Sequence, residues 1–319
     1  MKRIALLTSG GDAPGMNAAI RSVVRTGIYY GLEMIGIFYG YQGLMENQMI
    51  PLDLRSVGDI IQRGGTLLKT SRAPAFLTSE GRKKAYDVLE KEAIEGLIAI
   101  GGDGTFRGAL EMTKEGKTVI GIPGTIDNDI PGTEYTIGFD TAVNTVVEAM
   151  NKIRDTATSH ERVFIIEVMG RYSGNIALQA GLAGGAEAIL LPEVTPDLGA
   201  LVQSLQNSMR KGKKFSIILV AEGVMKATQL QTYLKESAEL ETWVTVLGHL
   251  QRGGTPSVTD RIVAAHMGSA AVEALLRGEK GKMVTWNCNQ IGLCDFEEML
   301  TAQRIFDSRS FKLANRLSI

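Results

Sequence analysis

Short runs of almost uninterrupted apolar residues recur along the chain, and glycine, proline or aspartate stands near the end of most of them. Strands of a parallel sheet have this character, because helices cover both faces of the sheet and leave no side for polar residues. We therefore expect buried parallel strands at six runs: Ile4–Leu7, Leu97–Ile100, Val119–Ile122, Val163–Val168, Ile189–Leu191 and Ile217–Ala221.

Amphipathic segments with helical spacing separate these runs. The clearest are Ala142–Arg154, Asp197–Arg210 and Val258–Leu276. Alternation of strand and helix is typical of βαβ units, so the sequence predicts an α/β fold with one or two doubly wound sheets. No linker rich in proline and serine marks a domain border. Two consecutive domains and two halves joined by several crossings therefore both remain open.

Length and composition narrow the class of protein. A chain of 319 residues suggests about two domains, and its 44% hydrophobic and 22% charged residues are those of an ordinary globular protein. The formal net charge of −1 provides no field that would favour nucleic acid or a membrane as partner. The first apolar run stops at Thr8, too early for a signal peptide, and Cys288 and Cys294 match no zinc or redox spacing. We expect a cytoplasmic protein with reduced thiols.

Two glycine-rich loops follow predicted strands and precede helices. The first is Thr8–Gly15 and the second is Gly101–Thr105. Glycine lets the backbone approach a phosphate, and a helix start offers free N–H groups to it. The first loop is neither a Walker A motif nor a spaced dinucleotide fingerprint, and a plain turn remains an equal alternative for it. In the second, Asp103 suits a Mg²⁺ ion beside nucleotide phosphates.

A rigid acidic loop follows the third predicted strand. It is Pro123–Pro131, in which Asp127 and Asp129 flank an asparagine between two prolines. A turn explains one aspartate but not a second one so close to the first. Phosphoryl transfer needs one group that accepts the proton of the attacking hydroxyl and another that holds the metal. The loop therefore indicates catalysis.

Three further motifs occur later in the chain, two of them directly after predicted strands. Met169-Gly170-Arg171 places an arginine where it can contact a transferring phosphoryl group in a bidentate way. Glu222 follows another strand, and Gly248–Gly254 holds His249 and Arg252 among glycines. A lone histidine is more often structural, but beside an arginine in such a loop we favour a contact with phosphate or hydroxyl.

Together, in this order, the six motifs resemble the ATP-dependent 6-phosphofructokinases of bacterial type, from Met1 to about Leu317. The resemblance implies two similar doubly wound, Rossmann-like, three-layer α/β domains with the active site in the cleft between them, assembled as a homotetramer. Residues 1–138 plus 252–304 would form the ATP-binding domain, and residues 139–251 plus 305–319 the sugar-phosphate-binding domain.

The resemblance also implies a role for each matching position. Asp127 would take the proton from the 1-hydroxyl of fructose 6-phosphate, while Thr125 and Arg171 would contact the γ-phosphoryl group. Asp103 and Asp129 would hold Mg²⁺. The ATP site would comprise Gly11, Tyr41, Arg72, Gly102, Asp103, Gly104, Thr105 and Gly108. The sugar-phosphate site would comprise Thr125, Asp127, Arg162, Met169, Gly170, Arg171, Glu222, His249 and Arg252, with Arg162 supplied by a neighbouring subunit.

The phosphoryl donor can be inferred from two glycines. Relatives that use pyrophosphate usually carry Asp at the position of Gly104 and Lys at that of Gly124, where the larger side chains would fill the space of the α-phosphate. Both positions are glycine here, so ATP is expected as the donor.

A regulatory site is implied as well. Arg21 and Arg25 share one helix face, Arg154 ends a predicted helix, and two lysines lie near another helix end. Taken alone, such basic residues are typical of solvated surface. The resemblance places an inter-subunit effector site for ADP or phosphoenolpyruvate at Arg21, Arg25, Asp59, Arg154, Gly185, Glu187, Lys211 and Lys213.

The main departure from the family pattern is Trp243, which stands where the family has an arginine that binds the 6-phosphate of the sugar. Two alternatives follow from it: a related sugar-phosphate kinase with shifted acceptor preference, or a weakly active, effector-binding paralogue. A nicotinamide dehydrogenase is disfavoured, because the spaced glycine fingerprint and its acidic ribose-binding residue are both missing.

Overall fold

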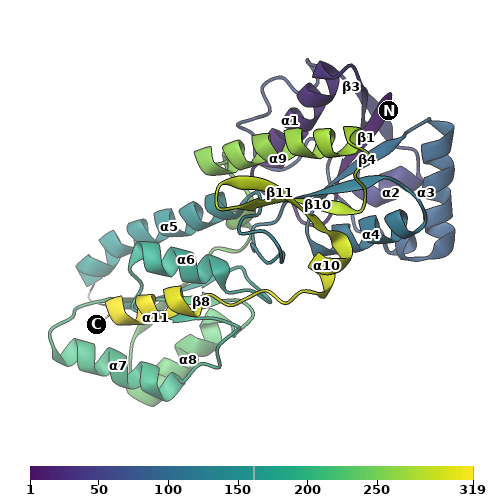
Figure 1. The fold of residues 1–319 in the computed structure, drawn as a ribbon. Helices are drawn as coiled ribbons and strands as arrows, with labels where there is room; N and C mark the ends of the chain where they lie inside the picture. Colours follow the sequence, from purple (N-terminus) through teal and green to yellow (C-terminus); the bar gives the residue numbers. More distant parts are fainter. Residues whose placement is uncertain (161, 319) are drawn as a thin grey trace. The chain divides into compact units, whose positions relative to one another are not determined.

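The chain folds into two compact units, each with its own sheet (Figure 1). The computed structural model describes residues 1–160 and 162–318. Unit 1 holds Met1–Ile126, Ile130–Thr141 and Arg252–Arg304, and unit 2 holds Asp127–Asp129, Ala142–Gln251 and Ile305–Ile319. The chain thus passes repeatedly between the units, which explains why no linker-like sequence separates them. Which ligand each domain binds stays a prediction.

Unit 1 is built on a seven-stranded sheet in the order β11-β10-β5-β4-β1-β2-β3. The five central strands are parallel, and β3 and β11 pair antiparallel at the two edges. The strands are β1 (Arg3–Thr8), β2 (Glu33–Ile37), β3 (Met49–Leu52), β4 (Gly96–Gly101), β5 (Val119–Pro123), β10 (Lys282–Asn287) and β11 (Gln290–Asp295).

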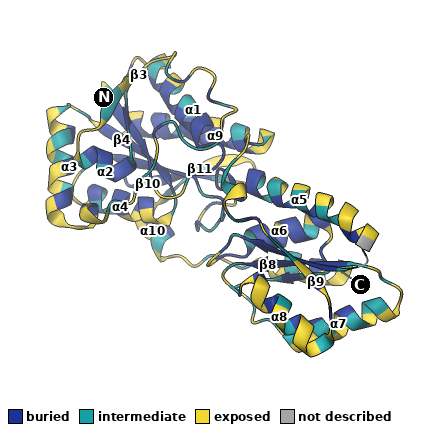
Figure 2. Ribbon diagram, turned by 180° about the vertical axis from the view of Figure 1, so that it is seen from behind, coloured by how far each residue is buried: buried dark blue, intermediate teal, exposed yellow. Residues whose placement is uncertain are grey.

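Helices cover both faces of this sheet. One face carries α1 (Met16–Tyr29) and α9 (Val258–Leu276), and the other carries the remaining helices of unit 1 (Figure 1). Those are α2 (Gly40–Met45), η1 (Pro74–Leu77), α3 (Ser79–Lys91), α4 (Asp103–Lys114) and α10 (Phe296–Thr301). Alternate residues of β1 and β4 serve the two faces, so nearly every residue of these strands is buried (Figure 2).

Unit 2 has a four-stranded, fully parallel sheet in the order β7-β8-β6-β9. Its strands are β6 (Val163–Val168), β7 (Ala188–Leu190), β8 (Ser216–Ala221) and β9 (Thr242–Val246). On one face, α7 (Leu198–Arg210) and α8 (Ala227–Ala238) bury an apolar cluster that includes Ile165, Leu205 and Leu230. The other face carries α5 (Phe139–His160), α6 (Asn175–Gly184) and α11 (Ser308–Leu317) (Figure 1). The α/β class with two doubly wound, three-layer domains is confirmed.

All six predicted strands are present and parallel, and α9 has the bounds expected for it. The predicted end of the helix at Arg154 is wrong, because α5 continues to His160 and Arg154 lies in its interior. Four residues of the continuation, Asp155, Thr156, Thr158 and Ser159, are polar and exposed, so the apolar periodicity fades there although the helix continues. The hydroxyl of Thr158 donates to the carbonyl of Arg154, four residues earlier in the same helix, at 2.6 Å.

The strands β2, β3, β9, β10 and β11 were not among those expected. The hairpin between β10 and β11 turns at Cys288 and Asn289, which have φ angles of +51° and +60°. Two residues with positive φ form the turn that suits a two-residue hairpin, but it is usually written Asn-Gly and is hard to recognise as Cys-Asn. Both cysteines, Cys288 and Cys294, are free. Among the helices described, none is long and apolar enough to cross a membrane.

A buried carboxylate fixes the segment that leads into α5. The side chain of Asp260, near the start of α9, is fully buried. It accepts the backbone N–H of Gly138 at 2.7 Å, that of Thr141 at 2.8 Å and the hydroxyl of Thr141 at 2.5 Å. Burial raises the pKa of Asp260 from 3.8 to about 6, although these hydrogen bonds oppose the shift.

This raised pKa predicts a pH-dependent contribution to stability. Asp260 stabilises the fold fully below its unfolded pKa of 3.8, and the contribution is lost as the pH rises through about 6. Asp260→Asn removes the titration. The free energy of unfolding of the native chain, relative to this variant, should therefore fall between pH 4 and pH 7, by at most about 3 kcal/mol. Urea unfolding followed by circular dichroism measures the difference. Parallel pH profiles for the two proteins would contradict the prediction, and Asp87→Asn on the exposed face of α3 is the control.

Candidate functional site

In unit 1, the predicted phosphate loops meet at the point where the strand order reverses. From β1 the chain continues to β2 and β3 on one side, and it then returns to place β4 and β5 on the other. Helices and loops leave such a point in opposite directions, which opens a crevice at the carboxyl ends of the strands. The loops that follow β1, β4 and β5 all start at this edge.

Backbone and side-chain hydrogen bonds tie the three loops together. The N–H of Ser9 donates to the carbonyl of Ile100 at 3.0 Å, and the hydroxyl of Thr105 donates back to the carbonyl of Ser9 at 3.1 Å. The N–H of Gly124 donates to the carbonyl of Gly101 at 3.0 Å. The first three motifs, far apart in sequence, therefore form one continuous surface.

The glycines of this surface are not equivalent. A Cβ atom added at Gly104 would meet no atom within 4 Å, and one at Gly102 would meet only the Cβ of Thr125, at 3.8 Å. The packing of the protein does not require glycine at these two positions, so the open space above them is available to a ligand. A Cβ at Gly11, in contrast, would collide with the guanidinium of Arg252.

Tyr41 and Gly108 pack against the second glycine loop, Gly101–Thr105, on its buried side. The ring of Tyr41 is buried, stacks on Phe76 with centroids 4.2 Å apart, and donates its hydroxyl to the carbonyl of Thr105 at 2.7 Å. Burial raises the pKa of Tyr41 above its usual value. Gly108 leaves room for this ring, since a Cβ there would lie 2.8 Å from it. These residues hold the Gly101–Thr105 loop in place.

Two charged residues predicted to bind ATP are exposed in unit 1. Asp103 opens α4, and its carboxylate accepts Nε of Arg107 at 2.9 Å. Arg72 lies in the irregular segment before η1, and no hydrogen bond or ion pair to another described side chain engages its guanidinium. Both are therefore accessible to a ligand.

The stem of the acidic loop belongs to unit 1 and its carboxylates belong to unit 2. The hydroxyl of Thr136 donates to the carbonyl of Thr125 at 2.7 Å. Asp127 and Asp129 are partly exposed on either side of the buried Asn128, whose φ is +46°. Asparagine tolerates this left-handed conformation better than most residues do.

In unit 2, the remaining motifs also gather at one sheet edge, after the neighbouring strands β8, β6 and β9. The N–H of Gly223 donates to the carbonyl of Gly170 at 3.2 Å. Gly170 has a φ of +129°, a value that side chains other than hydrogen rarely permit. Met169 and Glu222 are partly buried and Arg171 is exposed, so the arginine is free to reach a ligand.

Gln251 is a residue of this cluster that the sequence analysis did not single out. Its side chain is completely buried. Its Oε1 accepts the N–H of Met169 at 3.2 Å, and its Nε2 donates to the carbonyl of Gly248 at 3.0 Å. Gln251 thereby joins the loop after β6 to the turn after β9, and only its position between His249 and Arg252 could have indicated it.

His249 and Arg252 lie on a short 3₁₀ helix, η2 (Gly248–Arg252), instead of an open glycine loop. His249 is exposed. Arg252 is partly buried and belongs to unit 1, where its Nη1 donates to the carbonyl of Asp12 at 3.1 Å. The structure therefore places Arg252 at the first glycine loop.

Arg162, the residue before β6, contacts Trp243 on the neighbouring strand β9. The guanidinium carbon of Arg162 lies 5.1 Å from the centroid of the Trp243 ring, and its Nη2 lies 3.3 Å from a carboxylate oxygen of Glu241. Trp243 is 44% exposed. The arginine predicted to bind the sugar phosphate is thus engaged by an aromatic ring and a carboxylate.

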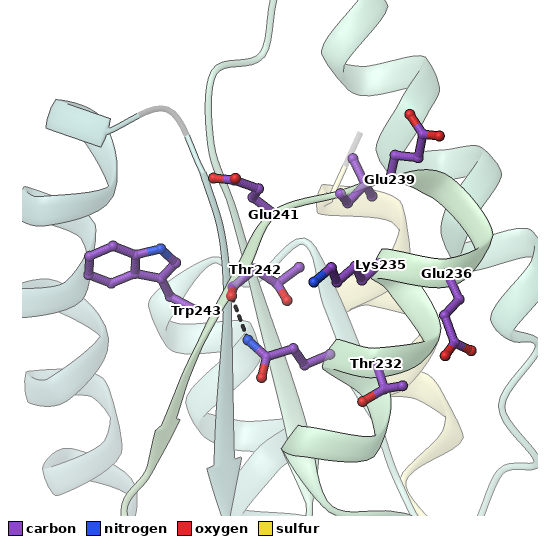
Figure 3. Close-up of a pocket in the computed structure, with 9 residues that line it drawn as sticks. Thr232, Lys235, Glu236, Glu239, Glu241, Thr242 and Trp243 are labelled. Carbon is purple, nitrogen blue, oxygen red and sulfur yellow. Dashed lines mark hydrogen bonds between the residues drawn. The ribbon is translucent and has the colours of Figure 1, made fainter.

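A wide surface pocket of about 980 Å³ lies beside this pair, between the end of α8 and the start of β9 (Figure 3). The close-up shows Lys235 pointing toward Thr242 and the indole of Trp243 pointing away from α8. None of the residues that line this pocket belongs to the predicted ATP, sugar-phosphate or effector sites.

Four of the predicted effector residues lie together in unit 2. Nη2 of Arg154 donates to the carbonyl of Gly184 at 2.5 Å and to that of Gly185 at 3.2 Å. Nζ of Lys213 lies 3.1 Å from a carboxylate oxygen of Glu187. Lys211 caps α7 nearby in sequence, while Arg21 and Arg25 on α1 and Asp59 belong to unit 1.

No group of three or more histidine, cysteine, aspartate or glutamate side chains in the described ranges is arranged to hold a metal ion. Magnesium is usually bound through one or two carboxylates together with substrate phosphates. Asp103 at the start of α4 in unit 1 and Asp129 in the acidic loop of unit 2 are each at least partly exposed, so either carboxylate is accessible to a metal that arrives with substrate phosphates.

Comparisons with known proteins agree with this arrangement. The family model described as phosphofructokinase matches residues 3–275. The ATP-dependent 6-phosphofructokinase of Thermoanaerobacter sp. (strain X514) is 56% identical over 321 residues, covering all of both chains. The protein of the same name from Bacillus subtilis (strain 168) is 53% identical over 319 residues, again covering both chains completely.

A solved structure supports the same assignment. The phosphofructokinase from Saccharomyces cerevisiae matches 99% of this chain with a TM-score of 0.88 and 35% sequence identity. This chain spans 47% of the length of that yeast chain. From the family model and the full-length relatives we conclude that the chain belongs to the phosphofructokinase family.

Proposed function

We propose that the chain is a glycolytic, ATP-dependent 6-phosphofructokinase. It transfers the γ-phosphoryl group of Mg-ATP to the 1-hydroxyl of D-fructose 6-phosphate and releases ADP and fructose 1,6-bisphosphate. One observation carries the proposal. The Pro123–Pro131 loop starts on the open glycine surface of unit 1, and the backbone of its carboxylates is held in unit 2, by the loop that carries Arg171.

The residues of the chain divide the work of transfer. The 1-hydroxyl oxygen of the sugar attacks the γ-phosphorus, and its proton passes to the carboxylate of Asp127. The bond from the γ-phosphorus to the bridging oxygen breaks, and ADP leaves with that electron pair. Arg171 and Thr125 contact the transferring group, whose charge is spread over its equatorial oxygens.

Nucleotide binding falls to the glycine surface of unit 1. The open space at Gly102 and Gly104 accepts phosphates close to the backbone, and the start of α4 provides N–H groups and a favourable dipole. Asp103 and Asp129 would hold Mg²⁺, which neutralises the phosphate charge when it is bound. Arg72 is placed in an exposed segment where it can approach the same phosphates.

Recognition of the sugar phosphate falls mainly to unit 2, through Met169, Gly170, Glu222 and His249. Arg252, which belongs to unit 1, and a neighbouring subunit's Arg162 complete the proposed set. The contact of Arg162 with Trp243 favours a second candidate, a related sugar-phosphate kinase with shifted acceptor preference. A weakly active paralogue is the third. It is disfavoured, because Asp103, Asp127, Asp129 and Arg171 are all present.

We further propose a homotetramer regulated by ADP or phosphoenolpyruvate and acting in the cytoplasm. Support for an effector site comes from Arg154, which lies beside Gly185, and from Lys213, which lies beside Glu187. Basic groups at that place suit an anionic effector.

The role of Asp127 predicts the outcome of one substitution. Asp127→Asn cannot accept a proton, so kcat should fall about 10²- to 10⁴-fold while KM for both substrates stays nearly unchanged. A coupled assay of ADP release with Mg-ATP and fructose 6-phosphate measures both constants. Asp87→Asn should behave as the native chain. A variant at position 127 that retained full kcat would refute the assigned role.

Trp243 stands where the family has an arginine that binds the 6-phosphate, and it also contacts Arg162. We therefore expect weak binding of the sugar phosphate. Trp243→Arg adds one charge-assisted phosphate contact, worth about 1.5–3 kcal/mol, and should lower the half-saturating concentration of fructose 6-phosphate about 10- to 150-fold. Trp243→Phe keeps an aromatic ring beside Arg162 and serves as the matched control. Equal half-saturation in the native chain and Trp243→Arg would show that the position does not limit sugar binding.

A further inference from the structure

The backbone of the acidic loop is held by two side chains that follow β6, those of Ser173 in the loop and Asn175 at the start of α6. Nδ2 of Asn175 donates to the carbonyl of Asp127 at 3.2 Å and to the carbonyl of Asn128 at 3.0 Å. The hydroxyl of Ser173 donates to the same carbonyl of Asp127 at 3.1 Å. All of these residues belong to unit 2.

These contacts act on the two peptide groups that flank Asn128. The carbonyl of Asp127 belongs to the peptide before Asn128, and the carbonyl of Asn128 belongs to the peptide after it. Asn128 is itself in the left-handed region, with a φ of +46°, and this conformation carries a steric cost for an L-residue. Hydrogen bonds to both peptides hold the turn in this conformation, and the turn sets the directions in which the side chains of Asp127 and Asp129 leave the backbone.

Asn175 is itself well fixed. It is the first residue of α6, and its Nδ2 also lies 2.6 Å from the hydroxyl of Ser173, which is buried. The preceding residue, Gly174, donates its N–H to a carboxylate oxygen of Glu193 at 2.8 Å. The helix start also carries a partial positive charge that favours the carbonyl oxygens beside it. The amide donor is therefore rigidly presented to the acidic loop.

We propose that Asn175 is a positioning residue for phosphoryl transfer. The segment from Gly170 to Asn175 carries Arg171 and Asn175 a few residues apart, so Asn175 sets where the base, Asp127, lies relative to the arginine that contacts the transferring group. The inference rests on the proposed kinase function. Asn175 does not touch the reacting atoms in this account; it acts through the backbone of Asp127 and Asn128.

The account requires a neutral donor at this position. Aspartate has almost the same shape as asparagine, but when ionised it cannot donate to either carbonyl. Alanine removes the donor and also the volume of the amide. Agreement between the two variants therefore separates loss of the hydrogen bonds from loss of side-chain shape.

The test compares the full-length native chain with Asn175→Ala, Asn175→Asp and a control, Asn207→Ala, at an exposed position of α7. The coupled assay with Mg-ATP and fructose 6-phosphate gives kcat and KM from pH 5.5 to 9, and thermal unfolding monitors the fold. Since small misplacements of a catalytic group cost up to about 10²-fold in rate, kcat of Asn175→Ala should fall about 10- to 100-fold with KM nearly unchanged. Asn175→Asp, which keeps the shape of the side chain but cannot donate when ionised, should show a similar fall in kcat.

Several outcomes would overturn the inference. If the native chain is active and Asn175→Ala has an unchanged kcat, the role of Asn175 is overturned and the kinase proposal still stands. A native chain without sugar-dependent release of ADP overturns both. If Asn175→Ala does not fold, Ser173→Ala decides instead, because it removes one donor to Asp127 and keeps Asn175. A fall in kcat with KM unchanged supports the inference, and an unchanged kcat overturns it.

Discussion

Parallel pairing of β1, β4 and β5 is the constraint on which the proposed nucleotide site depends. Because paired parallel strands end at the same edge, three loops separated by many residues of sequence are brought within hydrogen-bonding distance of one another. The reversal of strand order next to β1 keeps helices away from this edge. The same principle operates in unit 2, where β8, β6 and β9 end together. Gln251 joins the loops after β6 and β9, and Gly223 joins the loop after β8 to that after β6.

Glycine serves two distinct purposes in these loops. At Gly104 the space is open, so a small residue there is consistent with a ligand that approaches the backbone. At Gly108 and Gly170 the space is taken by Tyr41 and by the next turn of the chain, and glycine is needed for packing. Sequence alone cannot separate the two uses, since the residues that fill the space come from distant segments.

The parts of the structure that the sequence predicted are those governed by local patterns. Uninterrupted apolar runs gave the central strands, and helical periodicity gave α9 with its bounds. The extension of α5 beyond Arg154 and the edge strands carry no such pattern, because they are polar or short. Asn175, Gln251 and Asp260 were missed for a different reason. Each is a buried or partly buried polar residue whose partners lie 47 to 122 positions away or within a loop whose path the sequence does not reveal.

The central claim is that the chain moves the terminal phosphoryl group of ATP to the 1-hydroxyl of fructose 6-phosphate. The most direct measurement supplies ATP labelled in the γ-phosphoryl group, with Mg²⁺ and fructose 6-phosphate, and locates the label in the products. The account predicts label at carbon 1 of fructose 1,6-bisphosphate, and none on the sugar when labelled pyrophosphate replaces ATP. Label released only as inorganic phosphate, or left in ATP at every sugar concentration, would contradict it.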